Sequence, residues 1–83
     1  MEGKIIYEWD KFESEFTKLE NPKFYINLDV GNKGNVLRIY AETEDIVLIF
    51  EPEKMDLQIW MHELEKRSIE YKWGESPVKI IDL

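Results

Sequence analysis

Residues 23–42 read KFYINLDVGNKGNVLRIYAE, and this stretch decides the fold class. Apolar and polar positions alternate on both sides of a centre rich in glycine and asparagine. The apolar positions of one face are Phe24, Ile26, Leu28, Val30, Leu37, Ile39 and Ala41. A period of two is typical of β-strands, and Gly and Asn tolerate the backbone conformations of a tight turn. The stretch therefore predicts a β-hairpin.

The flanking segments extend this hairpin into a sheet with helices. Residues 46–50 are apolar at every position, which predicts a strand covered on both faces. Residues 4–8 predict a short first strand, and residues 69–83 predict a last hairpin. Two stripes at helical spacing predict two helices. They consist of Trp9, Phe12, Phe16 and Leu19, and of Leu57, Trp60, Met61 and Leu64.

One segment fits two patterns. Residues 55–61 also alternate, because Met55, Leu57, Ile59 and Met61 are apolar, so a strand is the alternative to the second helix. The helix is favoured because its period continues through residues 62–67. The sequence thus predicts one α+β domain over residues 1–83, with strands and helices in the order β-α-β-β-β-α-β-β. We expect an antiparallel sheet of about five to six strands with two helices packed on one face.

The alternation also predicts what lies opposite the helices. If the helices cover the face of Phe24 and Ile26, then Tyr25, Val36 and Tyr40 point away from them. This second face is either covered by the C-terminal hairpin or exposed as an aromatic surface for a partner. Among the tryptophans, Trp73 is expected near the surface, and Trp9 and Trp60 in the core.

The charge is strongly negative and unevenly placed. The 83 residues carry 18 Asp and Glu against 11 Lys and Arg, a net charge of −7. Residues 44–53 contain Glu44, Asp45, Glu51 and Glu53 and no basic residue, whereas residues 23–43 are net positive. Nucleic acids and acidic lipids are therefore not expected as direct ligands. A concentrated negative field instead favours a basic surface on a partner protein.

No pattern indicates catalysis, a metal or a cofactor. Cysteine is absent, and the only histidine, His62, has a lysine where a zinc-protease helix needs its second histidine. The glycines at 31 and 34 lack the helix and the Lys-Ser/Thr end of a phosphate loop, and residues 29–35 lack the closing glutamate of a calcium loop. A small enzyme that pairs His62 with a carboxylate is the least favoured alternative. No segment is long and apolar enough to serve as a signal peptide or membrane span, so a cytoplasmic protein is expected.

These observations predict a non-enzymatic, acidic protein-binding module. In size and acidity the chain is similar in kind to phage-encoded inhibitors that mimic DNA, and an inhibitor from a phage or mobile element, or an immunity or antitoxin partner, is the expected class. The alternative is an assembly protein that forms a homodimer or small subunit through the Tyr25 and Tyr40 face. The expected partner-binding residues are Tyr25, Asp29, Tyr40, Glu42, Glu44, Asp45, Glu51, Glu53 and Trp73.

Overall fold

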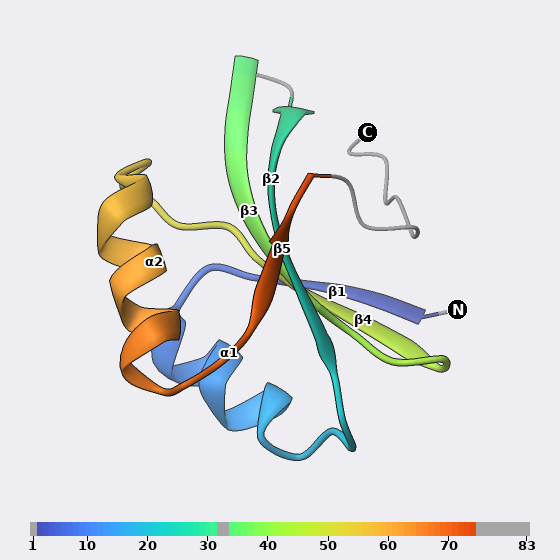
Figure 1. Ribbon diagram of the computed structural model, residues 1–83. Helices are drawn as coiled ribbons and strands as arrows, with labels where there is room; N and C mark the ends of the chain where they lie inside the picture. The colour runs from blue at the N-terminus through green and yellow to red at the C-terminus, as the bar shows by residue number, and fades with distance from the viewer. Residues whose placement is uncertain (1, 32–33, 75–83) are drawn as a thin grey trace.

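The computed structural model describes residues 2–31 and 34–74, which form a five-stranded sheet and two helices (Figure 1). Along the chain these elements are β1 (Glu2–Ile6), α1 (Trp9–Phe16), β2 (Lys23–Gly31), β3 (Gly34–Glu42), β4 (Ile46–Phe50), α2 (Leu57–Lys66) and β5 (Tyr71–Trp73). The α+β class and the helix after residue 56 are confirmed. The second strand of the expected C-terminal hairpin lies outside the described residues.

The sheet is mixed, with the strand order β1-β4-β3-β2-β5. Its centre is antiparallel as expected, because short turns join β2 to β3 and β3 to β4. The expectation of a wholly antiparallel sheet is wrong at both edges, where β1 pairs with β4 and β5 pairs with β2 in parallel. Along the chain, each edge strand is separated from its partner by a helix and two other strands, and a connection of that length permits a parallel pair. The alternation of apolar residues within a strand carries no information on whether the strand pairs in parallel or antiparallel.

Rows of side chains run across all five strands and alternate between the two faces. On the face that carries both helices, one row is Ile6, Phe50, Ile39, Ile26 and Trp73. The next row lies on the opposite, helix-free face and is Ile5, Ile49, Tyr40, Tyr25 and Lys72. The fully apolar strand β4 contributes to both faces and is buried on both, as its sequence predicts.

The main core lies between the sheet and the two helices. Phe12 and Phe16 of α1 and Leu64 of α2 pack on the helix side of β2, β3 and β4. Trp9 and Trp60 are half-buried against this core and stack on each other at 5.5 Å between ring centroids. Their expected place in the core is confirmed.

Polar contacts anchor the two helices. Asp56 caps α2 by accepting a hydrogen bond from the backbone N–H of Gln58 at 3.1 Å. Arg67, directly after α2, binds Glu13 of α1 and Glu63 of α2, and its guanidinium lies 5.2 Å from the centroid of the Trp9 ring. The C-terminal end of α2 is thereby held to α1. Among residues 2–31 and 34–74, no helix is long and apolar enough to cross a membrane.

Candidate functional site

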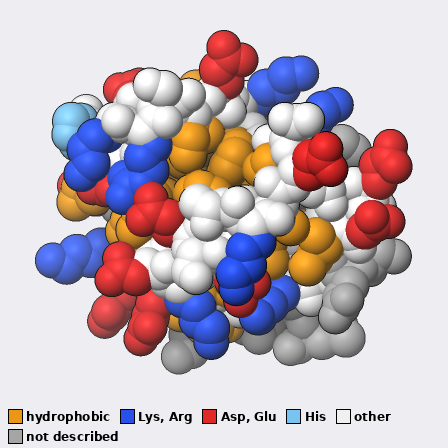
Figure 2. Space-filling model, turned by 90° about the horizontal axis from the view of Figure 1, so that it is seen from below, with side chains coloured by type: hydrophobic (Ala, Val, Ile, Leu, Met, Phe, Trp, Pro, Cys, Tyr) orange, Lys and Arg blue, Asp and Glu red, His pale blue; other side chains and the backbone are white. Residues whose placement is uncertain are grey.

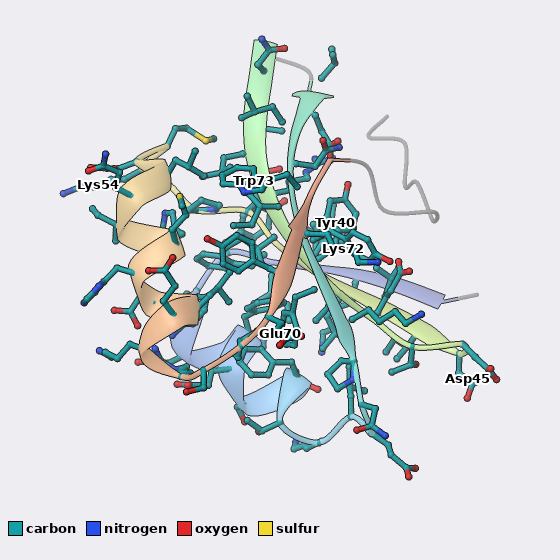
Figure 3. All side chains as sticks on the ribbon, viewed as in Figure 1. Tyr40, Asp45, Lys54, Glu70, Lys72 and Trp73 are labelled. Carbon is teal, nitrogen blue, oxygen red and sulfur yellow. The ribbon has the colours of Figure 1, made fainter. Side chains whose placement is uncertain are left out.

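The acidic residues of segment 44–53 do not form one patch. Glu44 and Asp45 lie at the turn before β4, whereas Glu51 and Glu53 follow its other end. Five extended residues separate the two sets, which is about 16 Å. Figure 3 shows Asp45 at the end of the sheet remote from Lys54 and Trp73. The concentration of charge in the sequence is therefore divided between two ends of the molecule.

Glu44 and Asp45, at the turn before β4, border an open groove. Glu42, Glu44 and Asp45 line it together with Glu20, and Lys18 and Lys23 line it as well. The groove encloses about 750 Å³. Figure 2, which views the molecule from below, shows acidic side chains at several separate places among Lys and Arg. The charges on this face are interspersed, so the local field is weaker than the net charge suggests.

Two other predicted residues, Asp29 and Glu51, are brought together by Arg38. The Arg38 side chain is 1% exposed, and it donates to Glu51 Oε1 through Nε at 3.0 Å and through a terminal nitrogen at 2.9 Å. Its other terminal nitrogen lies 3.5 Å from Asp29 Oδ2. Tyr40 donates its hydroxyl hydrogen to the same Asp29 oxygen. We call Asp29, Arg38, Tyr40 and Glu51 the Arg38 network.

The Arg38 network is electrostatically satisfied. Burial lowers the pKa of Arg38, but its hydrogen bonds and charge contact with Glu51 outweigh burial and raise that pKa above its usual value. Burial, together with the hydrogen bond to Asp29, raises the pKa of the Tyr40 hydroxyl well above its ordinary value. Arg38 thus stays charged and Tyr40 stays protonated at neutral pH. Such groups hold strands in register and supply neither a base nor a nucleophile.

The tyrosines do not form an exposed surface. Tyr25 and Tyr40 face each other across β2 and β3 and are 8% and 2% exposed, packed with Val47 and Ile49. Of the two alternatives for this face, the exposed aromatic surface is therefore wrong at these two positions. Alternation predicted correctly that they point away from the helices, but it carries no information on what covers that face. The segment that the covered alternative places there lies largely beyond Gly74, outside the described residues.

Large apolar side chains are exposed instead at and beside the far end of the β2–β3 hairpin, and singly at Tyr7 (65%) and Ile59 (44%). Among the described residues, Leu28 is 69% exposed, Val30 80%, Trp73 57% and Met55 48%. The expectation that Trp73 lies near the surface is confirmed. The hairpin extends beyond both helices at the top of Figure 1, so its outer part has no helix against it.

Two of these side chains, Leu28 and Trp73, line a groove between the hairpin and the start of α2. We call it the hairpin groove, and its lining residues are Ile26, Asn27, Leu28, Leu37, Leu57, Trp73 and Gly74. The groove encloses about 220 Å³. Met55 lies next to the lining residue Leu37, whose backbone N–H donates to the Met55 sulfur at 3.1 Å. Glu53, another predicted residue, is exposed two residues before Met55.

The exposure of Leu28 was missed from the sequence, which placed it under the helices. The sequence signal that could have revealed this exposure was the length of the predicted strand relative to the predicted helix. Nine extended residues of β2 reach about 30 Å, whereas the ten residues of α2 reach about 15 Å. A hairpin this long outreaches the helices that cover it. Met55 was likewise missed, although it lies outside the helical stripe of α2.

His62 is exposed on the surface of α2 and lines neither groove. Within residues 2–31 and 34–74, no group of three or more His, Cys, Asp or Glu is arranged to hold a metal ion. Comparisons of the chain with protein-family models, with curated proteins and with solved structures find no match.

Proposed function

We propose that this protein is a non-enzymatic binding module that docks on another protein through the hairpin groove. The target carries an apolar contact surrounded by basic residues. Occupation of that basic surface would make the protein an inhibitor of its target, or an immunity or antitoxin-type partner.

The observation that carries this proposal is the gathering of exposed apolar side chains at one end of the molecule. Leu28, Val30 and Trp73 are each more than half exposed, and Leu28 and Trp73 line the same groove. Large apolar side chains grouped on a small surface are typical of interfaces, and Trp and Met are enriched there. Polar residues next to this surface, such as Asn27 and Asp56, provide the kind of rim that interfaces show.

The charge supports a basic target. The segment that leads into Leu57, a lining residue of the groove, carries Glu53 and Asp56 against Lys54, and the whole chain carries a net charge of −7. A negative protein approaches a basic surface faster than a neutral one, and this gain decreases with salt. The two ends of β4 hold separate acidic sets, so steering around an apolar contact is favoured over a continuous imitation of a phosphate backbone.

The assembly alternative lacks the surface that it requires. It depends on an exposed face at Tyr25 and Tyr40, and both side chains are buried. The hairpin groove of one copy could still meet another copy, but two chains of charge −7 repel each other. A basic partner is therefore favoured over a second copy.

An affinity capture experiment with matched variants tests the proposal. The full-length protein, Trp73→Ser and the double variant Glu44→Gln/Asp45→Asn are immobilised and exposed to nuclease-treated lysate of the source cells at low and high salt. We expect one dominant protein that the wild type and the double variant retain and that Trp73→Ser loses. Capture should weaken at high salt because the rim charges are screened.

The double variant distinguishes docking at one end of the molecule from docking at the other. Loss of capture by the double variant, with Trp73→Ser unaffected, would move the docking site to the groove beside Glu44 and Asp45. Capture of no specific protein by the wild type at either salt concentration would contradict the proposed function.

A further inference from the structure

The outer edge of β2 continues past its partner strand. β5 pairs with β2 only from Phe24 to Ile26, and the ladder closes with the Gly74 N–H donating to the Ile26 carbonyl at 3.1 Å. β2 itself runs on to Gly31. Within residues 2–31 and 34–74, no strand pairs with Leu28 or Val30 on this side.

The direction of the backbone groups follows from that hydrogen bond. The N–H and C=O of one extended residue point to the same edge, and successive residues alternate. Because the Ile26 carbonyl faces β5, the backbone groups of Leu28 and Val30 face the same outer edge. Those of Asn27 and Asp29 face β3.

The side chains at this edge are also suited to a strand. Leu28 and Val30 project on the helix side, toward the hairpin groove. Its volume of about 220 Å³ is below the roughly 300–1,000 Å³ of small-molecule pockets and is suited to a single side chain. An added strand would therefore bring its own alternate side chains over Trp73 and the groove.

We propose that the partner contributes an extended, lysine- or arginine-rich segment that adds to the sheet as a strand beside Leu28–Val30 and places one apolar side chain in the hairpin groove. Strand addition takes its affinity from backbone hydrogen bonds and its specificity from pockets for alternate side chains. The net charge of −7, with Glu53 and Asp56 in the segment that leads into the lining residue Leu57, favours a basic segment. This inference rests on the proposed function and specifies its binding mode.

The test uses the full-length, isotope-labelled protein and a defined probe. The probe is a synthetic peptide in which lysine alternates with threonine around one central leucine, and the control peptide has glutamate in place of lysine. We expect the lysine peptide to shift the amide signals of Leu28 and Val30 and to slow their hydrogen exchange. The glutamate peptide should bind at least about tenfold more weakly.

Two variants at one position isolate the backbone contribution. Val30→Pro removes an N–H that faces the outer edge and leaves the β3 ladder intact, whereas Val30→Thr keeps that N–H. We expect Val30→Pro to weaken peptide binding about tenfold and Val30→Thr to stay within about threefold of the wild type. Circular dichroism and the amide signals of Ile39 and Ile49 verify that both variants remain folded.

Four outcomes would overturn the inference. The first is equal peptide binding by Val30→Pro and the wild type, and the second is no amide shift at millimolar peptide. The third is that the amides of Leu28 and Val30 are already protected from hydrogen exchange in the free protein. The fourth is that this protection grows with protein concentration. The third result would mean that residues 75–83 of the same chain occupy the edge, and the fourth that a second copy does. Lysate capture that depends on Trp73 would survive any of them, so the proposed function and its binding mode fail separately.

Discussion

Ile26 and Leu28 lie two residues apart on one strand and one face, yet Ile26 is 1% exposed and Leu28 is 69% exposed. Ile26 belongs to the hairpin root, the part of β2 and β3 over which the helices pack, with Phe24, Ile39 and Ala41. Leu28 and Val30 belong to the hairpin tip, the part that extends past the helices. The same alternation of apolar residues therefore builds a core at one end and a candidate binding surface at the other.

The comparison shows how a small protein can keep an apolar binding surface without losing stability. The root buries its side chains between sheet and helices, so it stabilises the fold. The tip is held by the β2–β3 ladder and by the Arg38 network and needs no apolar cover of its own. The tip residues Leu28 and Val30 thereby remain exposed.

Removal of Arg38 should have the largest effect, because Arg38 joins root and tip. It pairs with Asn27 across the hairpin and binds both Asp29 and Glu51. Arg38→Met removes the guanidinium from both carboxylates, of which only Asp29 keeps the hydrogen bond from Tyr40, and we expect a loss of about 3 kcal/mol in the free energy of unfolding. Arg38→Lys keeps the charge without the forked geometry and should lose about 1 kcal/mol. Urea denaturation measures both, and equal losses would show that the geometry of the network is unimportant.

The pair Ile26→Ala and Leu28→Ala tests the comparison itself. Truncation of buried Ile26 opens a cavity and should cost about 3 kcal/mol, whereas truncation of exposed Leu28 should cost at most about 0.5 kcal/mol. In peptide binding the order should reverse, with Leu28→Ala weakening binding and Ile26→Ala having little effect as long as the protein is folded. Similar stability losses for the two variants would mean that the tip is covered in solution.

The smallest expected effect concerns the contacts that anchor α2, one of the two helices that cover the hairpin root. A hydrogen bond from Arg67 lowers the pKa of Glu63, and the charge of Lys66 adds to this effect. This contribution to stability is fully present above the ordinary carboxyl pKa of about 4.3 and is lost as the pH falls through the lower folded value. Glu63→Gln should therefore be less stable than the wild type by under about 1 kcal/mol at neutral pH, with the gap closing in acid.

Thermal unfolding from pH 7 to about pH 2 measures that gap. Glu70→Gln, at an exposed position after α2, is the matched control and should follow the wild type throughout. A gap that persists unchanged in acid would mean that Glu63 stabilises α2 through packing and not through its charge.

The sequence was sufficient for most of the fold and for little of the site. The period of two in residues 23–42 and the two helical stripes are local signals, and they predicted the hairpin, both helices and the double-sided burial of β4. The parallel pairing of β1 and β5 depends on contacts between distant segments, which local patterns do not contain. Of the predicted site residues, Trp73 is exposed and lines the hairpin groove, and Glu53 is exposed before α2, whereas Asp29 and Glu51 are engaged by Arg38.

The sequence by itself determined which side chains share a face, because alternation follows from the geometry of an extended backbone. Only the tertiary structure decided which of those side chains are buried. That outcome depends on where α1 and α2 end relative to the hairpin, and on the placement of Arg38 opposite Glu51. Burial is a property of neighbours, and the neighbours of Tyr25 and Tyr40 include Val47 and Ile49 of β4, a separate strand.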